Sequence, residues 1–271
     1  MKSESTSSDG RRASGAETSR GRSWTSLVLA LAGAAVLLGA CSGSGPPETA
    51  PAPERFEWAV QHYRAGDYGS AVEGFRSFMV RNPLHENADS AQYLLASSFL
   101  EQGKAVQAAN EFSQLASTRP GSSLADDAQF GACRAYWEAS PGVARTQENT
   151  RAAIDACRRL TEFFPESPLI SDAEGLIQEA REKLAAKQYR IARYYFDQGF
   201  YESANIYLET VLSDYPESPV VPEVLATLYR SYTELGFESE AQSVRERLLS
   251  EYSDSPEAQR LEGMSDNGGG G

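Results

Sequence analysis

Residues on which most catalytic and metal sites depend are scarce in this chain of 271 residues. It contains two histidines, His62 and His85, and three cysteines, too few for most zinc sites or for histidine-dependent catalysis. Only four of its 25 basic residues are lysine, and none of the four lies in a glycine-rich stretch that could form a phosphate-binding loop. A Gly-x-Ser-x-Gly motif and a histidine pair at ligand spacing are also absent. Composition therefore favours a binding protein over an enzyme, and it predicts neither a metal nor a cofactor.

Positive charge is in short supply as well. The chain has 38 acidic residues against 25 basic ones, for a formal net charge of -13. Because a strongly acidic protein repels phosphate backbones, nucleic acid is a poor partner. Apolar residues make up 41% of the chain, which is enough to form a buried core.

The N-terminal residues have the pattern of a secretory signal. Residues 1–22 are polar and carry four arginines, and the apolar run Leu27–Leu38 follows. This run has twelve residues and would span about 18 Å as a helix. Crossing a bilayer takes roughly 20 residues, so the run is too short to do so. A basic stretch, a short apolar core and small residues predict a signal peptide over residues 1–40.

The signal ends in Leu38-Gly39-Ala40-Cys41, which resembles a bacterial lipobox. In such signals the cysteine is acylated, for example with palmitate, and becomes the mature N-terminus. The alternative is an ordinary signal peptide followed by an incidental cysteine. Removing residues 1–40 takes away five basic and three acidic residues and brings the formal charge to -15.

The segments on either side of the central part are expected to lack a core. After Cys41 the chain is rich in Gly, Ser and Pro, and residues 41–53 are interpreted as the lipidated cysteine and a flexible tether. Residues 265–271 end in four glycines and are expected to be a disordered tail. The folded domain is therefore predicted over residues 54–264.

A pattern of glycine, alanine, apolar residues and proline occurs five times in this domain, although the third copy is interrupted and the fifth has Ser253 in place of the proline. The recurrent alanines are Ala71, Ala108, Ala153, Ala204 and Ala241, and the first and last steps are 37 residues long. That period is close to the 34 residues of a tetratricopeptide repeat. In each unit the glycine would close a first helix, the alanine would allow close helix crossing, and the proline would end the second helix. Three Ser-Pro pairs are expected to supply an N-cap and a first-turn proline: Ser167-Pro168, Ser218-Pro219 and Ser255-Pro256.

The spacing thus predicts an all-α fold, a tetratricopeptide-type solenoid of five helix-turn-helix repeats. The alternative is a generic helical bundle with chance spacing.

Two irregularities interrupt the repeat pattern. Repeat three carries eight extra residues in a loop over Ser140–Thr150, which is expected to tolerate shortening, and Ser171–Gln198 is predicted to be one helix of about 28 residues.

Two cysteines fall on the two helices of repeat three, Cys133 and Cys157. An offset of one helical turn, about 5.4 Å, makes disulfide geometry marginal, and free cysteine is often a small buried hydrophobe. We therefore expect two buried thiols; the alternative is a disulfide, which the secreted compartment implied by the signal permits.

A stack of repeats presents the first helix of each unit along a concave surface. Aromatic residues and arginines recur at three aligned positions of these first helices. The candidate groove residues are Phe56, Tyr63, Tyr93, Phe130, Arg134, Trp137, Tyr189, Arg193, Phe196 and Arg230. Such a surface suits an extended or helical peptide. The alternative is that many of these aromatics simply pack between neighbouring repeats.

The stretches Ala185–Pro219 and Arg55–Pro83 resemble the BamD family of outer-membrane assembly lipoproteins. The resemblance covers roughly residues 54–260 and the lipobox, and it includes the repeat count, the insertion in repeat three and the long helix. Repeat one departs from the family at Pro83-Leu84-His85, where the usual Tyr-Pro-x-Ser-Pro is missing. Because of this departure, the resemblance does not assign the surfaces that dock the partners.

The resemblance implies a periplasmic scaffold that is lipid-anchored at the outer membrane. Its implied partners are a β-barrel insertase, the other lipoproteins of the assembly complex, unfolded outer-membrane protein segments and the lipid that holds the acylated cysteine. Two alternatives are a tetratricopeptide lipoprotein of cell-envelope or division maintenance and a regulatory subunit of a peptidoglycan enzyme.

Overall fold

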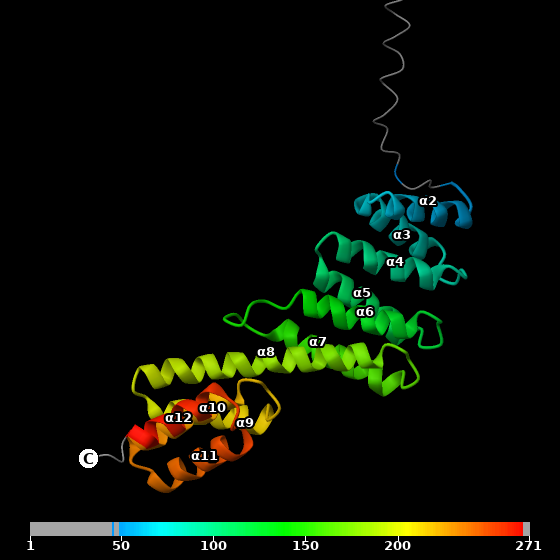
Figure 1. Cartoon of the computed structure of the whole chain (residues 1–271). Helices are drawn as coiled ribbons and strands as arrows, with labels where there is room; N and C mark the ends of the chain where they lie inside the picture. Colours follow the sequence, from blue (N-terminus) through cyan, green and yellow to red (C-terminus); the bar gives the residue numbers. More distant parts are fainter. Residues whose placement is uncertain (1–44, 46–48, 268–271) are drawn as a thin grey trace, which may run out of the picture. The chain divides into compact units, whose positions relative to one another are not determined.

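A computed structural model of the chain describes residue 45 and residues 49–267 (Figure 1). The expected signal peptide, Cys41 and most of the tether lie outside the described residues, as does the stretch 268–271. The described residues form eleven α-helices and no strand. None of these helices is long and apolar enough to cross a membrane.

Ten of the helices pair in chain order into five helix-turn-helix repeats. The pairs are α2 (Ala52–Arg64) with α3 (Tyr68–Arg81), α4 (Ala88–Glu101) with α5 (Ala105–Thr118), α6 (Ala125–Glu138) with α7 (Glu148–Phe163), α8 (Ile170–Asp197) with α9 (Tyr201–Asp214), and α10 (Val221–Leu235) with α11 (Glu238–Glu251). A final helix, α12 (Pro256–Asn267), packs on α10 and α11. The predicted all-α solenoid of five tetratricopeptide-type repeats is confirmed.

Four of the five turns inside the repeats depend on a glycine with positive φ. Gly66, Gly103, Gly199 and Gly236 have φ between 71° and 78°, a region that residues with a Cβ rarely adopt. At the first of these turns, the Gly66 N–H donates to the Tyr63 carbonyl and the next N–H donates to the His62 carbonyl. This pattern satisfies carbonyls at the end of the first helix and reverses the chain tightly.

The recurrent alanines lie at the helix crossings, as the spacing predicted. All five are buried, with at most 5% of their surface exposed. Small side chains there let each second helix approach its first helix closely. A glycine extends this principle in repeat one, where a Cβ on Gly74 would lie 2.7 Å from the Ala59 Cβ.

The prolines end the second helices, but only one of the three Ser-Pro pairs caps a helix as expected. The Ser255 hydroxyl accepts from the Ala258 N–H at 3.1 Å, and Pro256 begins α12. Ser167 and Ser218 instead accept from the N–H two residues later, because α8 and α10 begin at Ile170 and Val221. Two of the three predicted N-caps were therefore wrong: these serines close a turn ahead of the helix.

Repeat three closes its turn without a positive-φ glycine. Its loop, residues 139–147, is organised around Gln147, whose amide donates to the carbonyls of Gly142 and Arg145 at 3.0 and 3.1 Å. Only 2% of the Gln147 surface is exposed. The insertion therefore has a packed interior, which its sequence did not predict.

Cys133 of α6 and Cys157 of α7 form a disulfide, with Cα atoms 5.0 Å apart. The prediction of two free thiols was wrong. The expected one-turn offset is absent because α6 and α7 cross at these two residues, and both side chains are fully buried.

The long helix is confirmed: α8 runs for 28 residues. Both ends of the predicted domain shift slightly. Helix α2 starts at Ala52, inside the expected tether, with Pro53 in its first turn, and α12 continues to Asn267, inside the expected tail. Helix α2 thus begins two residues before the expected start of the domain, and α12 ends three residues beyond its expected end.

Candidate binding groove

The first helices of neighbouring repeats touch one another except at the step from α4 to α6, which make no comparable contact among the described residues. Helix α2 contacts α4, α6 contacts α8, α8 contacts α10, and α10 contacts α12. Second helices make no comparable contact with each other in the part of the chain that the structure describes. A stack whose first helices lie closer together curves with those helices inside. All ten predicted groove residues lie on first helices, and we call this surface the first-helix face.

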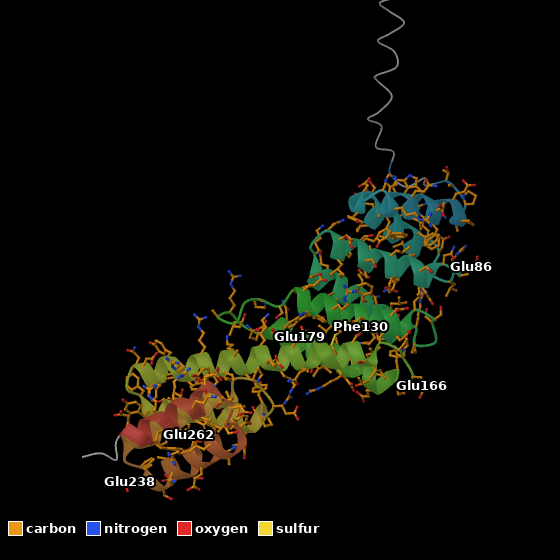
Figure 2. All side chains as sticks on the ribbon, viewed as in Figure 1. Glu86, Phe130, Glu166, Glu179, Glu238 and Glu262 are labelled. Atoms are coloured by element: carbon orange, nitrogen blue, oxygen red, sulfur yellow. A yellow bond between two sulfur atoms is a disulfide. The ribbon has the colours of Figure 1, made fainter. Side chains whose placement is uncertain are left out.

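One hollow on this face lies between α6 and the first half of α8, and its volume is about 660 Å³. Phe130, Arg134 and Trp137 line its α6 side, so three predicted groove residues come together. Asp172 and Glu179 line the α8 side; Phe130 and Glu179 are labelled in Figure 2. This α6–α8 hollow therefore offers aromatic surface together with charges of both signs.

A second hollow, of about 450 Å³, lies between α8, α10 and α12. Three more predicted groove residues line it, Tyr189, Arg193 and Arg230. The Tyr189 hydroxyl lies 3.1 Å from the Thr227 hydroxyl, and Arg193 donates to it at 3.5 Å. These bonds fix the tyrosine ring between α8 and α10. We call this site the α8–α12 hollow.

Charged side chains of both signs line the α8–α12 hollow: three arginines, Arg193, Arg230 and Arg260, and two glutamates, Glu223 and Glu257. The hydrogen bond to Tyr189 raises the pKa of Arg193 above its ordinary value, and the charge of Asp197 acts in the same direction. The Arg230 guanidinium stacks 4.8 Å above the Phe196 ring, and it has no carboxylate partner among the described residues. Arg260 is paired with Glu257 at 3.2 Å. The hollow can therefore offer the Arg230 guanidinium to an anionic or aromatic group of a ligand.

The predicted groove residues of repeats one and two serve mainly the core of their own repeats. The Phe56 ring lies 5.4 Å from the ring of Phe78, which is fully buried. The Tyr93 ring meets the Phe112 ring edge-on at 5.2 Å, and burial raises the pKa of its phenol. Tyr63 meets Tyr68 at 5.6 Å in the same way.

Phe196 also belongs mostly to the core, since only 8% of its surface is exposed, and it packs edge-on against Tyr201. The ten predicted residues thus divide into two sets. Six line hollows and four pack within repeats.

Sequence reasoning missed the part of the face that α12 contributes. Glu257, Arg260 and Leu261 line the α8–α12 hollow, although the five-repeat count ends before them. The Ser255-Pro256 pair in the sequence did indicate this further helix, because a serine followed by proline is typical of a helix start. No cluster of three or more metal-ligating side chains occurs within residue 45 and residues 49–267.

Comparison with protein families gives a match over most of this architecture. The model of the YfiO family, described as outer membrane lipoprotein, matches residues 49–248. The chain belongs to the YfiO family. The match spans all five repeats of the YfiO solenoid and leaves out only α12 and the end of α11.

Two curated relatives carry the BamD name, in agreement with the resemblance seen in the sequence. The putative outer membrane protein assembly factor BamD of Aquifex aeolicus (strain VF5) is 28% identical over 194 residues. That match covers 70% of this YfiO chain and 63% of the relative, so the chain spans less than two thirds of its length. The outer membrane protein assembly factor BamD of Caulobacter vibrioides is 23% identical over 214 residues, which cover 77% of this chain and 70% of the relative.

Among solved structures, the TPR2AB domain of yeast Sti1 in complex with pHSP90 is similar to this YfiO protein. It is 12% identical, with a TM-score of 0.39 over 76% of this chain and 80% of that one. The assignment of the fold rests on the helix pairs and glycine turns described above.

Proposed function

We propose that this YfiO protein is a lipid-anchored periplasmic scaffold of the outer-membrane β-barrel assembly complex. In this proposal it acts by binding alone: it docks the insertase subunit and other lipoproteins of the complex, and it receives segments of unfolded barrel precursors. Cys41, acylated after removal of residues 1–40, would hold the chain on the periplasmic face of the outer membrane.

The observation that carries the proposal is the first-helix face of a member of this family. Its two hollows gather aromatic rings and arginines, Trp137 and Arg134 in one and Tyr189 and Arg230 in the other. Aromatic residues and arginine are the side chains that most often dominate peptide and protein interfaces. An extended segment of an unfolded precursor suits a surface with two such hollows.

Affinity capture of the full-length chain from solubilised membranes, followed by mass spectrometry, tests the role in assembly. We expect a β-barrel insertase among the captured proteins. Capture of division proteins or a peptidoglycan enzyme without the insertase would instead favour one of the two alternative functions.

Binding of a urea-unfolded β-barrel precursor tests the groove directly. The pair Trp137→Ala and Tyr189→Ala, one residue in each hollow, should weaken binding by about tenfold. Phe163→Ala is the matched control, because this aromatic residue is 64% exposed on α7, a second helix. Equal weakening by the control would place precursor binding elsewhere.

Substitution of Cys41 tests the anchor. Cys41→Ser should release the protein from the membrane fraction, since the Gly/Ser/Pro tether carries no apolar segment of its own. An unchanged membrane fraction after a high-salt wash would exclude the acylated cysteine as the anchor.

A further inference from the structure

The charges of this acidic protein are unevenly distributed. Residues 134–190 contain nine basic and nine acidic residues, whereas residues 191–271 contain five and fifteen. All the ion pairs among the described residues lie before residue 120 or after residue 192. The middle of the chain therefore concentrates cations that its own carboxylates do not engage.

Part of this positive charge lies on one side of α8. Lys183, Lys187 and Arg190 follow each other at steps of four and three residues, which places them on one face of a helix over about 10 Å. Ala185 and Ala192 lie on the opposite side and are fully buried in the core. The three cations thus point away from the helices that α8 packs against in repeat four.

The insertion of repeat three adds to this face. Lys187 donates to the Arg145 carbonyl, and Lys183 donates to the Ser140 hydroxyl at 2.7 Å. Lys183 also lies 4.8 Å above the Trp137 ring. These contacts hold the loop against α8 and bring the Arg145 backbone next to Lys187. Figure 2 shows side chains that end in nitrogen projecting from this loop and from the stretch of α8 beside it.

We define the basic stripe as Arg145, Lys183, Lys187 and Arg190. Arg145 and Arg190 are exposed, and neither guanidinium has a hydrogen-bond or ion-pair partner within the described part of the chain. Exposed guanidinium groups without internal partners are free to bind carboxylates in a two-pronged geometry. An exposed tyrosine, Tyr194, continues the same face one turn beyond Arg190.

The surroundings of the stripe decide what kind of anion fits. Glu179 lies near one end of this face of α8 and Asp197 near the other, and the strongly acidic last repeats follow. A broad anionic surface, such as a membrane or a nucleic acid, would meet these carboxylates as well and be repelled. A narrow, extended segment would contact the stripe alone.

We propose that the basic stripe docks an extended acidic segment of a partner protein. The stripe lies on a different side of α8 from Tyr189 and Phe196, so this interaction is separate from binding in the α8–α12 hollow. Charge complementarity of this kind speeds association and selects partners more than it adds affinity.

Fluorescence anisotropy of a labelled glutamate-rich peptide of about ten residues, titrated with the full-length chain, tests the proposal. The test variant is Arg145→Glu with Arg190→Glu, which leaves the two lysines that hold the loop. The matched control is Arg158→Glu with Arg159→Glu, two exposed arginines of α7 that make the same change in net charge. Reversal in the stripe should weaken binding about tenfold, and reversal in the control less than twofold, because exposed charge contacts act over roughly a Debye length.

Several results would overturn the proposal. They are no binding of the peptide by the wild type, equal weakening by both double variants, and complete competition by soluble glycerophosphoglycerol at a concentration matched to the peptide charge. The last result would assign the stripe to a lipid headgroup. Circular dichroism and the urea midpoint check that the test variant is folded, and Arg190→Gln alone, with an expected threefold loss, replaces it if it is not. Precursor binding in the α8–α12 hollow, which lies on another side of α8, should be unchanged in both test variants, and this separates the test from that of the proposed function.

Discussion

Repeats two and three solve the same packing problem by different means. In repeat two Gly103, at φ +71°, closes the turn after the first helix, and the crossing is filled by Phe112. In repeat three a loop of nine residues replaces the glycine turn, and Cys157 stands at the position of Phe112, four residues after the recurrent alanine. The disulfide to Cys133 joins the two helices there. Repeat three thus lacks both the glycine turn and the large side chain at the crossing. The disulfide and the buried Gln147 hold its two helices together instead.

The largest expected effect concerns the aromatic residue of repeat two. Phe112→Ala should lower the free energy of unfolding by about 3–5 kcal/mol, because the ring is buried against Tyr93 and Gly131 and its loss leaves a cavity. Urea denaturation followed by circular dichroism measures it, with Phe163→Ala as the exposed control. A loss below about 1 kcal/mol would show that repeat two does not depend on this side chain.

Removal of the disulfide should cost nearly as much. The bond closes a loop with a sequence separation of 24, so Cys133→Ala with Cys157→Ala should lower the free energy of unfolding by about 3 kcal/mol. A reductant should shift the denaturation midpoint of the wild type and leave that of the double variant unchanged. Mass spectrometry of the unreduced, alkylated protein would contradict this prediction if it found both thiols alkylated.

The packed loop of repeat three should be more sensitive than surface loops usually are. Gln147→Ala removes three hydrogen bonds of a buried amide, two that it donates and one that it accepts from the Thr150 hydroxyl, and should cost about 2 kcal/mol. Gln107→Ala, in an exposed position of α5, should change the midpoint very little. Equal effects of the two substitutions would mean that the loop does not support the helix pair.

A substitution in the glycine turn of repeat two should have a smaller effect on stability, opposite in sign to that of a glycine substitution inside a helix. Gly103→Ala places a Cβ at positive φ and should cost about 1 kcal/mol. Gly175→Ala, inside α8 with no atom within 4 Å of the new Cβ, should stabilise the protein by about 0.5–1 kcal/mol. The two thermal midpoints should therefore move in opposite directions.

The smallest effect is a titration that should be independent of repeat three. Burial and the bond from the Tyr232 hydroxyl to Glu209, at 2.7 Å, raise the pKa of Tyr232 to about 12. A raised pKa means that the protonated phenol stabilises the fold. This contribution is fully present below the ordinary tyrosine pKa of about 10 and is lost as the pH rises through about 12.

Unfolding free energies between about pH 9 and pH 12 measure this titration. Tyr232→Phe should reduce the dependence to the part that comes from Tyr68 and Tyr93, whose pKa values burial also raises, and the variant without the disulfide should keep it in full. A dependence that is undiminished in Tyr232→Phe would assign the titration to another group.

The regular part of the fold could be predicted because its determinants are local. A glycine at the turn, an alanine at the crossing and a proline after the second helix each constrain the backbone within a few residues. Helix α8 was predictable for the same reason, since the stretch lacks proline and contains a single glycine.

The errors arose where the outcome depends on how two helices are placed. Cys133 and Cys157 form a bond because of the crossing geometry of α6 and α7, which spacing along the chain does not determine. The division of the aromatic residues follows the same rule: Phe56 and Phe130 occupy equivalent positions, yet one packs on Phe78 and the other lines a hollow beside α8.

The unbroken length of α8 has a mechanical consequence. At about 1.5 Å per residue, its 28 residues form a rod of about 42 Å. Ala173, near its start, is buried in the core of the first three repeats, and Ala192, near its end, is buried in the core of repeat four. A tilt imposed on one end, for instance by a cargo bound to the early repeats, must therefore reach the other end as rigid rotation. Binding of a partner to the first three repeats would then change the orientation of the last two repeats.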